Sequence, residues 1–496
     1  MSDTSCYIGV DLGTSGLRVL LINEAQESVS SAEQPYGVQH PHAGWSEQDP
    51  AHWSKALQTA FNTLRKEAPK AYQRVKAIGV SGHMHGAVLL NKQGKVLRPC
   101  ILWNDTRSHL EAAALDQMPL FRERSGNIVF PGFTAPKIAW VKRNEPEVFN
   151  AITQVLLPAA YLNYWFTGHT FSDYSDSSGT SWLNVDAQNW DEELLQATSL
   201  TTENMPKLIA SNEVGATLKR DVAQALSLSE DVKVVGGAGD NAAAACGIGA
   251  IRNGQGFLSL GTSGVILLAR DTCTPRPETA VHTFCHALAG RWFQMGVMLA
   301  AADCLNWLAS VTGQSPQNLT SALGPKLQAP QDTRFFPYLS GERTPHNDPH
   351  IRGELSHITA NTTPVTLTQS VLEGVSFALR DTFETLKVAG NAPQALTVIG
   401  GGNQSSYWLS LLATVLELPL MKPAEGEFGA ALGAARLALS GDTQGKPEDI
   451  MYAPEIARAI EPDRHLVPDF NRAFERFKLD YDSLKRLQNN TSATTT

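Results

Sequence analysis

The sequence predicts an α/β protein of two related domains, each with a mixed sheet flanked by helices. A chain of 496 residues is too long for one hydrophobic core, since single cores stop growing at roughly 250–300 residues. The pentapeptide LGTSG begins at Leu12 and returns at Leu260, half a chain later. In each half, a second β-branched run also enters a glycine-rich turn, as expected of a duplicated α/β unit.

The two LGTSG copies predict β-hairpins. The chain reads IGVDLGTSGLRVLLI in the first half and GFLSLGTSGVILLA in the second, which is an apolar strand, a short turn and another apolar strand. Tight hairpin turns commonly need positive φ, so we expect the glycines of these turns to supply it.

Each half then continues with a strand that runs into glycines. These segments read VKAIGVSGHMHGAVLL and ALTVIGGGNQSSYW. Amphipathic stretches lie between them, such as DPAHWSKALQTAFNTLRKEA, whose apolar residues recur at helical spacing. We place the domain boundary in the IRNGQG turn, between Ala250 and Gly256, which divides the chain into residues 1–250 and 251–496.

Composition and charge favour small solutes as partners. The formal net charge is −9, without an acidic run or a Lys/Arg-rich stretch, so neither nucleic acid nor an anionic membrane is an expected partner. No apolar stretch reaches the roughly 18 residues that span a bilayer, and the first residues lack the pattern of a signal peptide, so we expect a cytoplasmic protein. The six cysteines form no CxxC pair, which fits reduced thiols rather than disulfides or zinc.

The hairpin turns are the candidate phosphate site, because the P-loop pattern GxxxxGK(S/T) is absent. Small residues let backbone N–H groups approach phosphate oxygens, and hydroxyl groups add donors. The candidate residues are Gly13, Thr14, Ser15, Gly261, Thr262 and Ser263. Phosphate would repel Asp11, so we assign this carboxylate to a Mg²⁺ ion, through its waters, and Arg18 to phosphate neutralisation. The alternative is that GTSG is only a tight turn.

The segment VKVVGGAGDNAAAACGIG predicts a strand, a glycine turn and a helix that begins at or just after Asp240 and Asn241. Asp240 could simply be the N-cap of this helix. A carboxylate at the floor of such a turn could also take a proton from a substrate hydroxyl. The segment nearly matches a dinucleotide fingerprint, but no acidic residue follows at the distance that NAD binding requires.

Histidines at His83, His85, His282 and His286 could be metal ligands or polar groups in turns. Zinc is disfavoured because a third ligand and an HExxH-type context are missing. A sugar site uses such groups differently: His85 can hydrogen-bond a hydroxyl while Met84 packs on the carbon face. Trp103 offers a flat apolar wall, although a core aromatic needs no further role.

The ordered set of motifs between about Tyr7 and Leu439 resembles the FGGY carbohydrate kinases. The motifs are IGVDLGTSG, GWSEQDP, GHMHGA, LWNDTR, PGFTAPKIAWV, GGAGDNAAA, LSLGTSGV, FPYLSGERTPH and IGGGNQSSYW. The resemblance implies two actin-like (ribonuclease H-like) domains around a central ATP and sugar cleft. It also implies ATP-dependent phosphorylation of a small ketose or polyol, and we expect D-xylulose to be that substrate.

Carried over by position, the resemblance makes Asp240 the proton acceptor and places Asp11 near magnesium. Met84 and His85 become the substrate-contacting pair, with Trp103 and Asn241 beside them. Asn241 stands where glycerol kinases have glutamine, which argues against glycerol. The residues implied for the adenosine site are Gly401, Gly402, Asn306 and Ser406.

The sequence departs from the family pattern at three positions. His83 replaces a glutamine that is common before Met-His-Gly, Arg18 replaces a lysine, and Asn403 replaces a small residue. A kinase for ribulose, gluconate or another polyol shares every nucleotide motif. An ATP-switched protein like actin shares the hairpins but needs no sugar base, and fold likeness alone does not decide function. Such kinases are commonly homodimers, so a homodimer is a further expectation.

Overall fold

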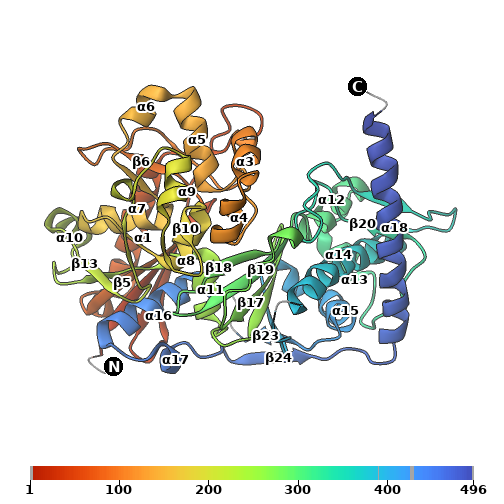
Figure 1. Cartoon of the computed structure of the whole chain (residues 1–496). Coiled ribbons are helices and arrows are strands. Elements are labelled where there is room, and N and C mark those ends of the chain that lie inside the picture. Colours follow the sequence, from red (N-terminus) through yellow and green to blue (C-terminus); the bar gives the residue numbers. More distant parts are fainter. Residues whose placement is uncertain (1–3, 389, 425–428, 494–496) are drawn as a thin grey trace.

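The structure is a computed structural model that describes residues 4–388, 390–424 and 429–493. The chain forms two lobes side by side, each built on a mixed β-sheet (Figure 1). Every helix among the described residues is too short or too polar to span a lipid bilayer.

The two sheets have the same central topology. In the first lobe β2 and β1 form an antiparallel hairpin, and β5 and β14 continue the sheet in parallel. In the second lobe β17, β16, β22 and β23 repeat this order and these directions. The first sheet consists of β3 (Ser28–Pro35), β2 (Gly16–Asn23), β1 (Cys6–Leu12), β5 (Val75–Gly82), β14 (Lys233–Val235) and β13 (Val214–Thr217), with β15 (Ala238–Gly239) also paired to β5. The second consists of β18 (His282–Cys285), β19 (Trp292–Met298), β17 (Gly264–Arg270), β16 (Gly256–Leu260), β22 (Leu396–Ile399), β23 (Leu420–Pro423) and β24 (Ile456–Ile460). The predicted duplication is confirmed.

The two LGTSG segments form the predicted hairpins, but the glycines do not supply positive φ. Gly13, Gly16, Gly261 and Gly264 all lie outside the left-handed region. Close approach explains the glycine at Gly16 instead: a Cβ there would lie 2.8 Å from the carbonyl oxygen of Gln34 on the adjacent strand.

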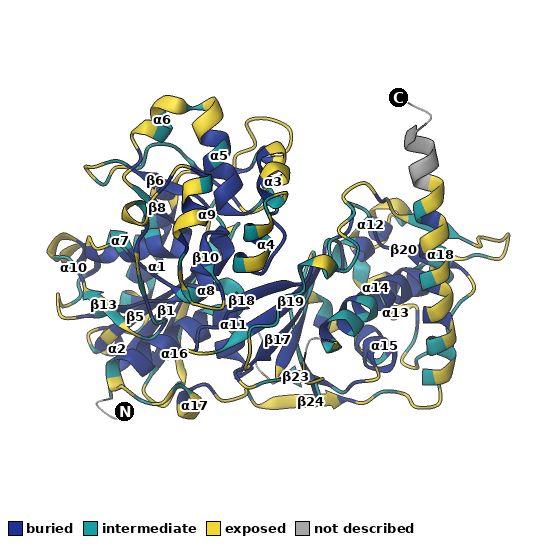
Figure 2. Ribbon diagram, in the orientation of Figure 1, coloured by how far each residue is buried: buried dark blue, intermediate teal, exposed yellow. Residues whose placement is uncertain are grey.

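Amphipathic helices cover the outer face of each sheet. On the first sheet these are α1 (Pro50–Glu67), α7 (Pro158–Thr167) and α10 (Arg220–Leu226). The predicted helix α1 begins after Asp49, whose side chain accepts a hydrogen bond from the Ala51 N–H. On the second sheet they are α14 (Pro364–Lys387) and α15 (Ser406–Leu416), and α12 (Ala302–Thr312) and α18 (Val467–Ala493) pack against these helices. Figure 2 shows dark-blue buried strands and inner helix faces, with exposed residues on the outer side of α18.

A helical region projects from the first lobe at the top of Figure 1. It has an apolar core of its own, which packs Phe121, Ile138, Trp182 and Leu194 together. Its helices are α3 (His109–Asp116), α4 (Pro119–Ser125), α5 (Thr134–Asn144), α6 (Pro146–Asn150) and α9 (Glu192–Ala197). Within it, the short pairs β4 (Glu47–Gln48) with β7 (Cys100–Ile101), and β6 (Val88–Leu90) with β8 (Gln154–Leu156), brace the loops around residues 83–87 and 101–107.

Two helices lie between the sheets and share one apolar core with both of them. These are α11 (Asp240–Gly247) and α16 (Gly429–Thr443). Helix α16 comes from the second half of the sequence but packs on β1 and β5 of the first lobe. Its backbone lies so close that a Cβ on Gly9 would fall 1.9 Å from the carbonyl oxygen of Ala431. The second half of the chain therefore completes the first lobe.

Candidate active site

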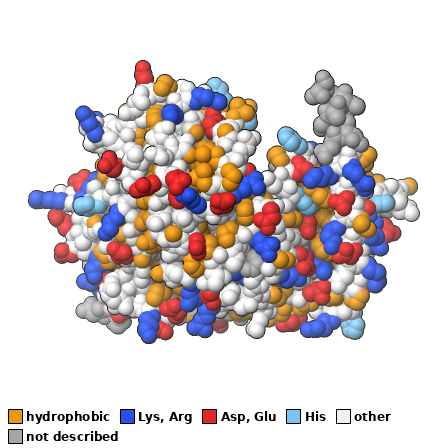
Figure 3. Space-filling model, viewed as in Figure 1, with side chains coloured by type: hydrophobic (Ala, Val, Ile, Leu, Met, Phe, Trp, Pro, Cys, Tyr) orange, Lys and Arg blue, Asp and Glu red, His pale blue; other side chains and the backbone are white. Residues whose placement is uncertain are grey.

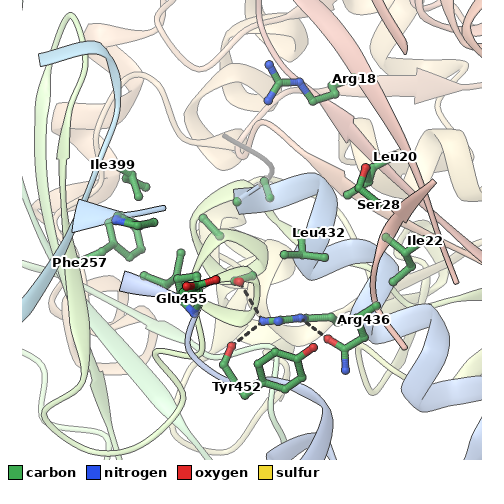
Figure 4. A pocket seen from close by; sticks show the side chains of 18 of the residues that line it. Arg18, Leu20, Ile22, Ser28, Phe257, Ile399, Leu432, Arg436, Tyr452 and Glu455 are labelled. Carbon is green, nitrogen blue, oxygen red and sulfur yellow. Dashed lines mark hydrogen bonds between the residues drawn. The ribbon is translucent and has the colours of Figure 1, made fainter. Parts of the chain in front are cut away.

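A cavity of about 1410 Å³ lies between the lobes. Strands of both sheets and the helices α11 and α16 line it, with Arg18 near one end and Arg436 at the other (Figure 4). Asp240, Asn241 and Gly400 also line this space. Lys/Arg and Asp/Glu side chains are interspersed over the face seen in Figure 3, so that face carries no large patch of one sign.

Asp240 is the first residue of α11, and Gly239 occupies the N-cap position. The interpretation of Asp240 as a mere helix cap is therefore wrong. Its Oδ1 instead accepts hydrogen bonds from Asn241, from the backbone N at 2.7 Å and from Nδ2 at 2.8 Å. Burial raises the pKa of Asp240 to about 6, and the two bonds from Asn241 oppose that rise. A carboxylate with a pKa near neutrality can both take up and release a proton.

Asp11 lies near the end of β1, where Ser81 Oγ donates to its Oδ1 at 3.3 Å. Burial, and then the charge of Asp240, raise the pKa of Asp11 to about 7. Two desolvated carboxylates that repel each other suit a divalent cation, and Mg²⁺ is commonly held by one or two carboxylates, waters and substrate phosphates. Within the described residues no group of three His, Cys, Asp or Glu side chains could hold a metal by itself. The donor set fits magnesium better than zinc.

The first hairpin turn connects the expected phosphate site to Trp103. The Trp103 Nε1–H donates to Thr14 Oγ1 at 2.9 Å, while 40% of the tryptophan remains exposed. The backbone oxygen of Thr14 accepts from Gln48 Nε2 at 2.6 Å. Trp103 is thus more than an apolar wall, a role that its sequence position alone did not indicate.

Arg18 faces Asp11 across the β1–β2 ladder, and its charge lowers the pKa of Asp11. The guanidinium also forms an ion pair with Glu33 on β3. The Arg18 side chain remains partly exposed and lines the cavity.

Met84 and His85, the expected substrate-contacting pair, lie together beside the start of α11. A Cβ added to Gly239 would lie 3.0 Å from Met84 Cγ, which places Met84 directly beside the start of α11. His85 Nδ1 lies 2.7 Å from the carbonyl oxygen of Gly179, and its ring stacks on Phe133 with a centroid distance of 4.4 Å. Burial lowers the pKa of His85 to about 3. The neutral ring must donate from Nδ1 to this carbonyl, so Nε2 is an acceptor suited to a sugar hydroxyl.

His83 is not part of this surface. It is buried, packs edge-on against Trp53 at 5.5 Å, and neither ring nitrogen has a hydrogen-bond partner in the described structure. Burial lowers the pKa of His83 to about 3, so the side chain is a neutral core residue.

The expected adenosine residues surround the second hairpin. Gly401 and Gly402 lie in the 3₁₀ turn after β22, and a Cβ on Gly402 would meet Leu260 Cβ at 2.8 Å, just before the LGTSG turn. A Cβ on Gly401 would meet nothing within 4 Å, so this backbone is open to a ligand. Asn306 is exposed on α12, and Ser406 is the exposed first residue of α15. The Ala302 N–H at the start of α12 donates to the Gly261 carbonyl at 3.0 Å, which ties α12 to the hairpin.

Duplicated lobes, a glycine-rich hairpin turn in each lobe and a carboxylate in the cavity between the lobes together define a two-lobed phosphotransferase. The chain belongs to the FGGY family of carbohydrate kinases: the model of the family's N-terminal domain matches residues 6–247, and that of the C-terminal domain matches residues 256–441. The protein is therefore a carbohydrate kinase that uses ATP, as expected, and the alternative of a non-enzymatic ATP-switched protein is set aside. The expected two-domain fold is confirmed.

Known relatives cover nearly the whole chain. The xylulose kinase of Escherichia coli K12 is 46% identical over 483 residues, which is 96% of this chain and 99% of the relative. The xylulose kinase of Klebsiella pneumoniae is 44% identical over 485 residues, 97% of this chain and 99% of the relative. The crystal structure of a xyloylose kinase from Brucella ovis shares 51% identity with a TM-score of 0.96, covering 97% of this chain and 100% of that one.

Proposed function

We propose that the protein transfers the γ-phosphoryl group of ATP to D-xylulose, giving ADP and D-xylulose 5-phosphate, with Asp240 as the general base. The observation that carries this is the half-buried carboxylate at the start of α11, whose pKa desolvation raises to about 6 and which follows Gly239 beside Met84. The extent of similarity to proteins named xylulose kinase supports the choice of sugar.

In the proposed step, Asp240 accepts the proton of the sugar O5 hydroxyl as O5 attacks the γ-phosphorus. The bond between the γ-phosphorus and the β,γ-bridging oxygen breaks, ADP leaves with that electron pair, and Asp240 later releases its proton to water. Asn241 holds the carboxylate through its two hydrogen bonds, at 2.7 and 2.8 Å. Phosphoryl transfer has a loose transition state, so positioning supplies much of the rate enhancement.

At the sugar end, His85 Nε2 accepts a hydroxyl proton while Met84 packs on the carbon backbone. The fixed bond from His85 Nδ1 to the Gly179 carbonyl orients the ring, so binding need not order it. Trp103 forms one side of this surface. Its Nε1–H donates to Thr14 Oγ1 in the hairpin that would receive phosphate.

At the nucleotide end, the turns Gly13–Ser15 and Gly261–Ser263 provide backbone N–H and hydroxyl donors to phosphate oxygens. Gly401 and Gly402, with Asn306 and Ser406, form the adenosine side. Asp11 would hold Mg²⁺, which when bound neutralises charge on the phosphate oxygens. The charge that Asp240 exerts on Asp11 supports this assignment, because a cation relieves it.

The test is a coupled ADP-release assay with Mg-ATP against D-xylulose, D-ribulose, xylitol, glycerol and D-gluconate. We expect D-xylulose to give the highest kcat/KM. Strong preference for another sugar would refute the substrate and keep the enzyme class. A cytoplasmic location and a homodimer stay predictions, and sedimentation velocity would measure the latter.

A further inference from the structure

The sugar end of the site continues beyond His85 into the second lobe. His85 stacks on Phe133, and the Phe133 ring centroid lies 5.7 Å from that of His282 on the edge strand β18. His282 in turn stacks on Phe284 at 5.4 Å. The contacts therefore run from Gly239 at the start of α11 to Met84, and from the adjacent His85 through Phe133 to His282, which the other lobe supplies.

Arg343 stands at the end of this series. Its Nη1 lies 3.4 Å from His282 Nε2, and its guanidinium lies over the ring of Phe130 at 4.7 Å. Phe130 belongs to the first lobe, so this arginine reaches across the domain interface. Burial lowers the pKa of His85, and the charges of Lys137 and Arg343 add to this effect, whereas Arg18 acts on Asp11. Arg343 therefore lies near the expected sugar residues, and Arg18 lies near the expected phosphate hairpin.

No carboxylate forms an ion pair with Arg343 in the part of the chain that the structure describes. The adjacent Glu342 uses its Oε1 to accept the backbone N–H groups of Leu299 at 3.0 Å and of Arg343 at 2.7 Å. Burial lowers the pKa of Arg343 to about 10, because the charged form of the guanidinium is less stable away from water. A partly buried guanidinium with so few protein acceptors would be stabilised by a ligand oxygen.

His282 keeps Arg343 in a defined orientation. An arginine can only donate, so His282 Nε2 must accept, and the ring must be neutral. The structure agrees, because burial and the charge of Arg343 lower the pKa of His282 well below its ordinary range. In the described structure the Nε and Nη2 groups of Arg343 donate to no protein acceptor, and the residue is only partly buried.

We propose that Arg343, positioned by His282, donates to the C2 carbonyl oxygen of the ketose, at the end of the sugar away from Asp240. This inference rests on the proposed function and identifies which chemical feature of the substrate is recognised. A carbonyl oxygen accepts only, which complements a group that donates only. The sugar then touches the base in one lobe and the arginine in the other, so binding favours the closed cleft.

The experiment compares kcat/KM for D-xylulose with that for xylitol and D-arabitol, its C2-reduced forms, in wild type and in Arg343→Gln. We expect Arg343→Gln to lower kcat/KM for D-xylulose by roughly 10- to 100-fold, mainly through KM, since a charge-assisted hydrogen bond is lost. The pentitols should lose much less, so the ketose-to-pentitol ratio should fall. His282→Phe keeps the aromatic stack and should lower the same ratio.

Arg276→Gln is the matched control, because Arg276 lies on the same lobe with 41% of its side chain exposed and pairs only with Glu278 in the described structure. It should leave all ratios unchanged. Arg343→Lys, which keeps the charge but loses the planar fork, should recover only part of the ratio. Thermal midpoints confirm that each variant is folded.

Equal losses of kcat/KM for the ketose and the pentitols in Arg343→Gln leave their ratio unchanged and would overturn the proposal. The absence of any loss would overturn it as well. A wild type that turns over D-gluconate, with this activity lost in Arg343→Gln, would show that the guanidinium recognises a carboxylate and would also overturn it. If another ketose replaces D-xylulose as substrate, the proposed function fails separately. The ratio measured with that ketose and its reduced form then supports or overturns the role of Arg343.

Discussion

Arg436 Nη1 donates to the carbonyl oxygen of Gly247 at 2.8 Å, and so holds the last turn of the helix that begins at Asp240. The same group donates to the Cys246 carbonyl at 3.0 Å and to the Tyr452 carbonyl at 2.9 Å, while Nε donates to Gln26 Oε1 at 2.8 Å (Figure 4). The carbonyls at a helix end lack intrahelical partners. One buried guanidinium thus joins α11, α16, the β2–β3 turn and the segment that returns to the second lobe.

Arg436→Gln should therefore destabilise the protein. Arg436 is only 2% exposed, so the change leaves the buried carbonyl groups that it contacts without a donor. Loss of such a network costs about 2–4 kcal/mol. The midpoint of urea unfolding measures the effect. Arg252→Gln is the control, because Arg252 is exposed, and this change should leave the midpoint unaltered. Equal midpoints for the two variants would contradict the role of Arg436.

Asp240→Asn should reduce kcat while leaving ATP binding intact. Asparagine keeps the shape of the side chain but cannot accept the hydroxyl proton, and a general base contributes about 10²–10⁴-fold. The coupled ADP assay gives kcat, and fluorescence titration gives the nucleotide Kd. Asp271→Asn, at an exposed aspartate, is the control. Retention of more than about a tenth of kcat in Asp240→Asn would contradict the assignment, given that range.

The kcat/KM for the sugar should fall below about pH 6. The base must be ionised, and burial raises the pKa of Asp240 to about 6, so protonation inactivates the enzyme below that pH. The measurement is a profile from pH 4.5 to 8.5, a range of about four units around this pKa, at saturating Mg-ATP. A profile that stays flat to the lowest pH would mean that Asp240 titrates as an ordinary carboxyl or is not the base.

The substitution Asp240→Asn should also stabilise the folded protein above about pH 6. The pKa of Asp240 is raised on folding, so the native state binds this proton more tightly, and stability falls as pH rises from the unfolded pKa of 3.8 through about 6. Above that pH, Asp240→Asn should gain about 3 kcal/mol, while at pH values below about 4 the advantage should vanish. Urea midpoints at both ends of the range test this sign.

Gly433→Ala should destabilise the protein although alanine is the better helix former. A Cβ at Gly433 would lie 1.8 Å from the carbonyl oxygen of Ala243, so α16 and α11 would have to separate. Overpacking of this kind costs about 1–3 kcal/mol or more, which exceeds the roughly 1 kcal/mol gain in helix propensity. Gly37→Ala is the control, because a Cβ there would meet nothing within 4 Å. A higher thermal midpoint for Gly433→Ala would refute the close packing.

Local patterns predicted much of the site because its residues lie at the ends of strands and at glycine turns. The LGTSG repeats, the turn before Asp240 and the Met84–His85 pair are each short and continuous in sequence. Packing of α11 between the two sheets places the turn before Asp240 beside Met84. The φ values of the hairpin glycines could not be predicted, since at Gly16 the neighbouring strand, and not the turn itself, excludes a side chain.

Strand alternation, glycine turns and helix starts are local properties of the sequence, so they predicted two mixed-sheet domains, the hairpins and the candidate base. The packing of α16 on the first lobe, the hydrogen bond from Trp103 to Thr14, and the contact of Arg343 with Phe130 in the other lobe became visible only in the folded structure. These contacts join residues far apart in the chain. Their partners are chosen by the packing of whole elements, which no local pattern records.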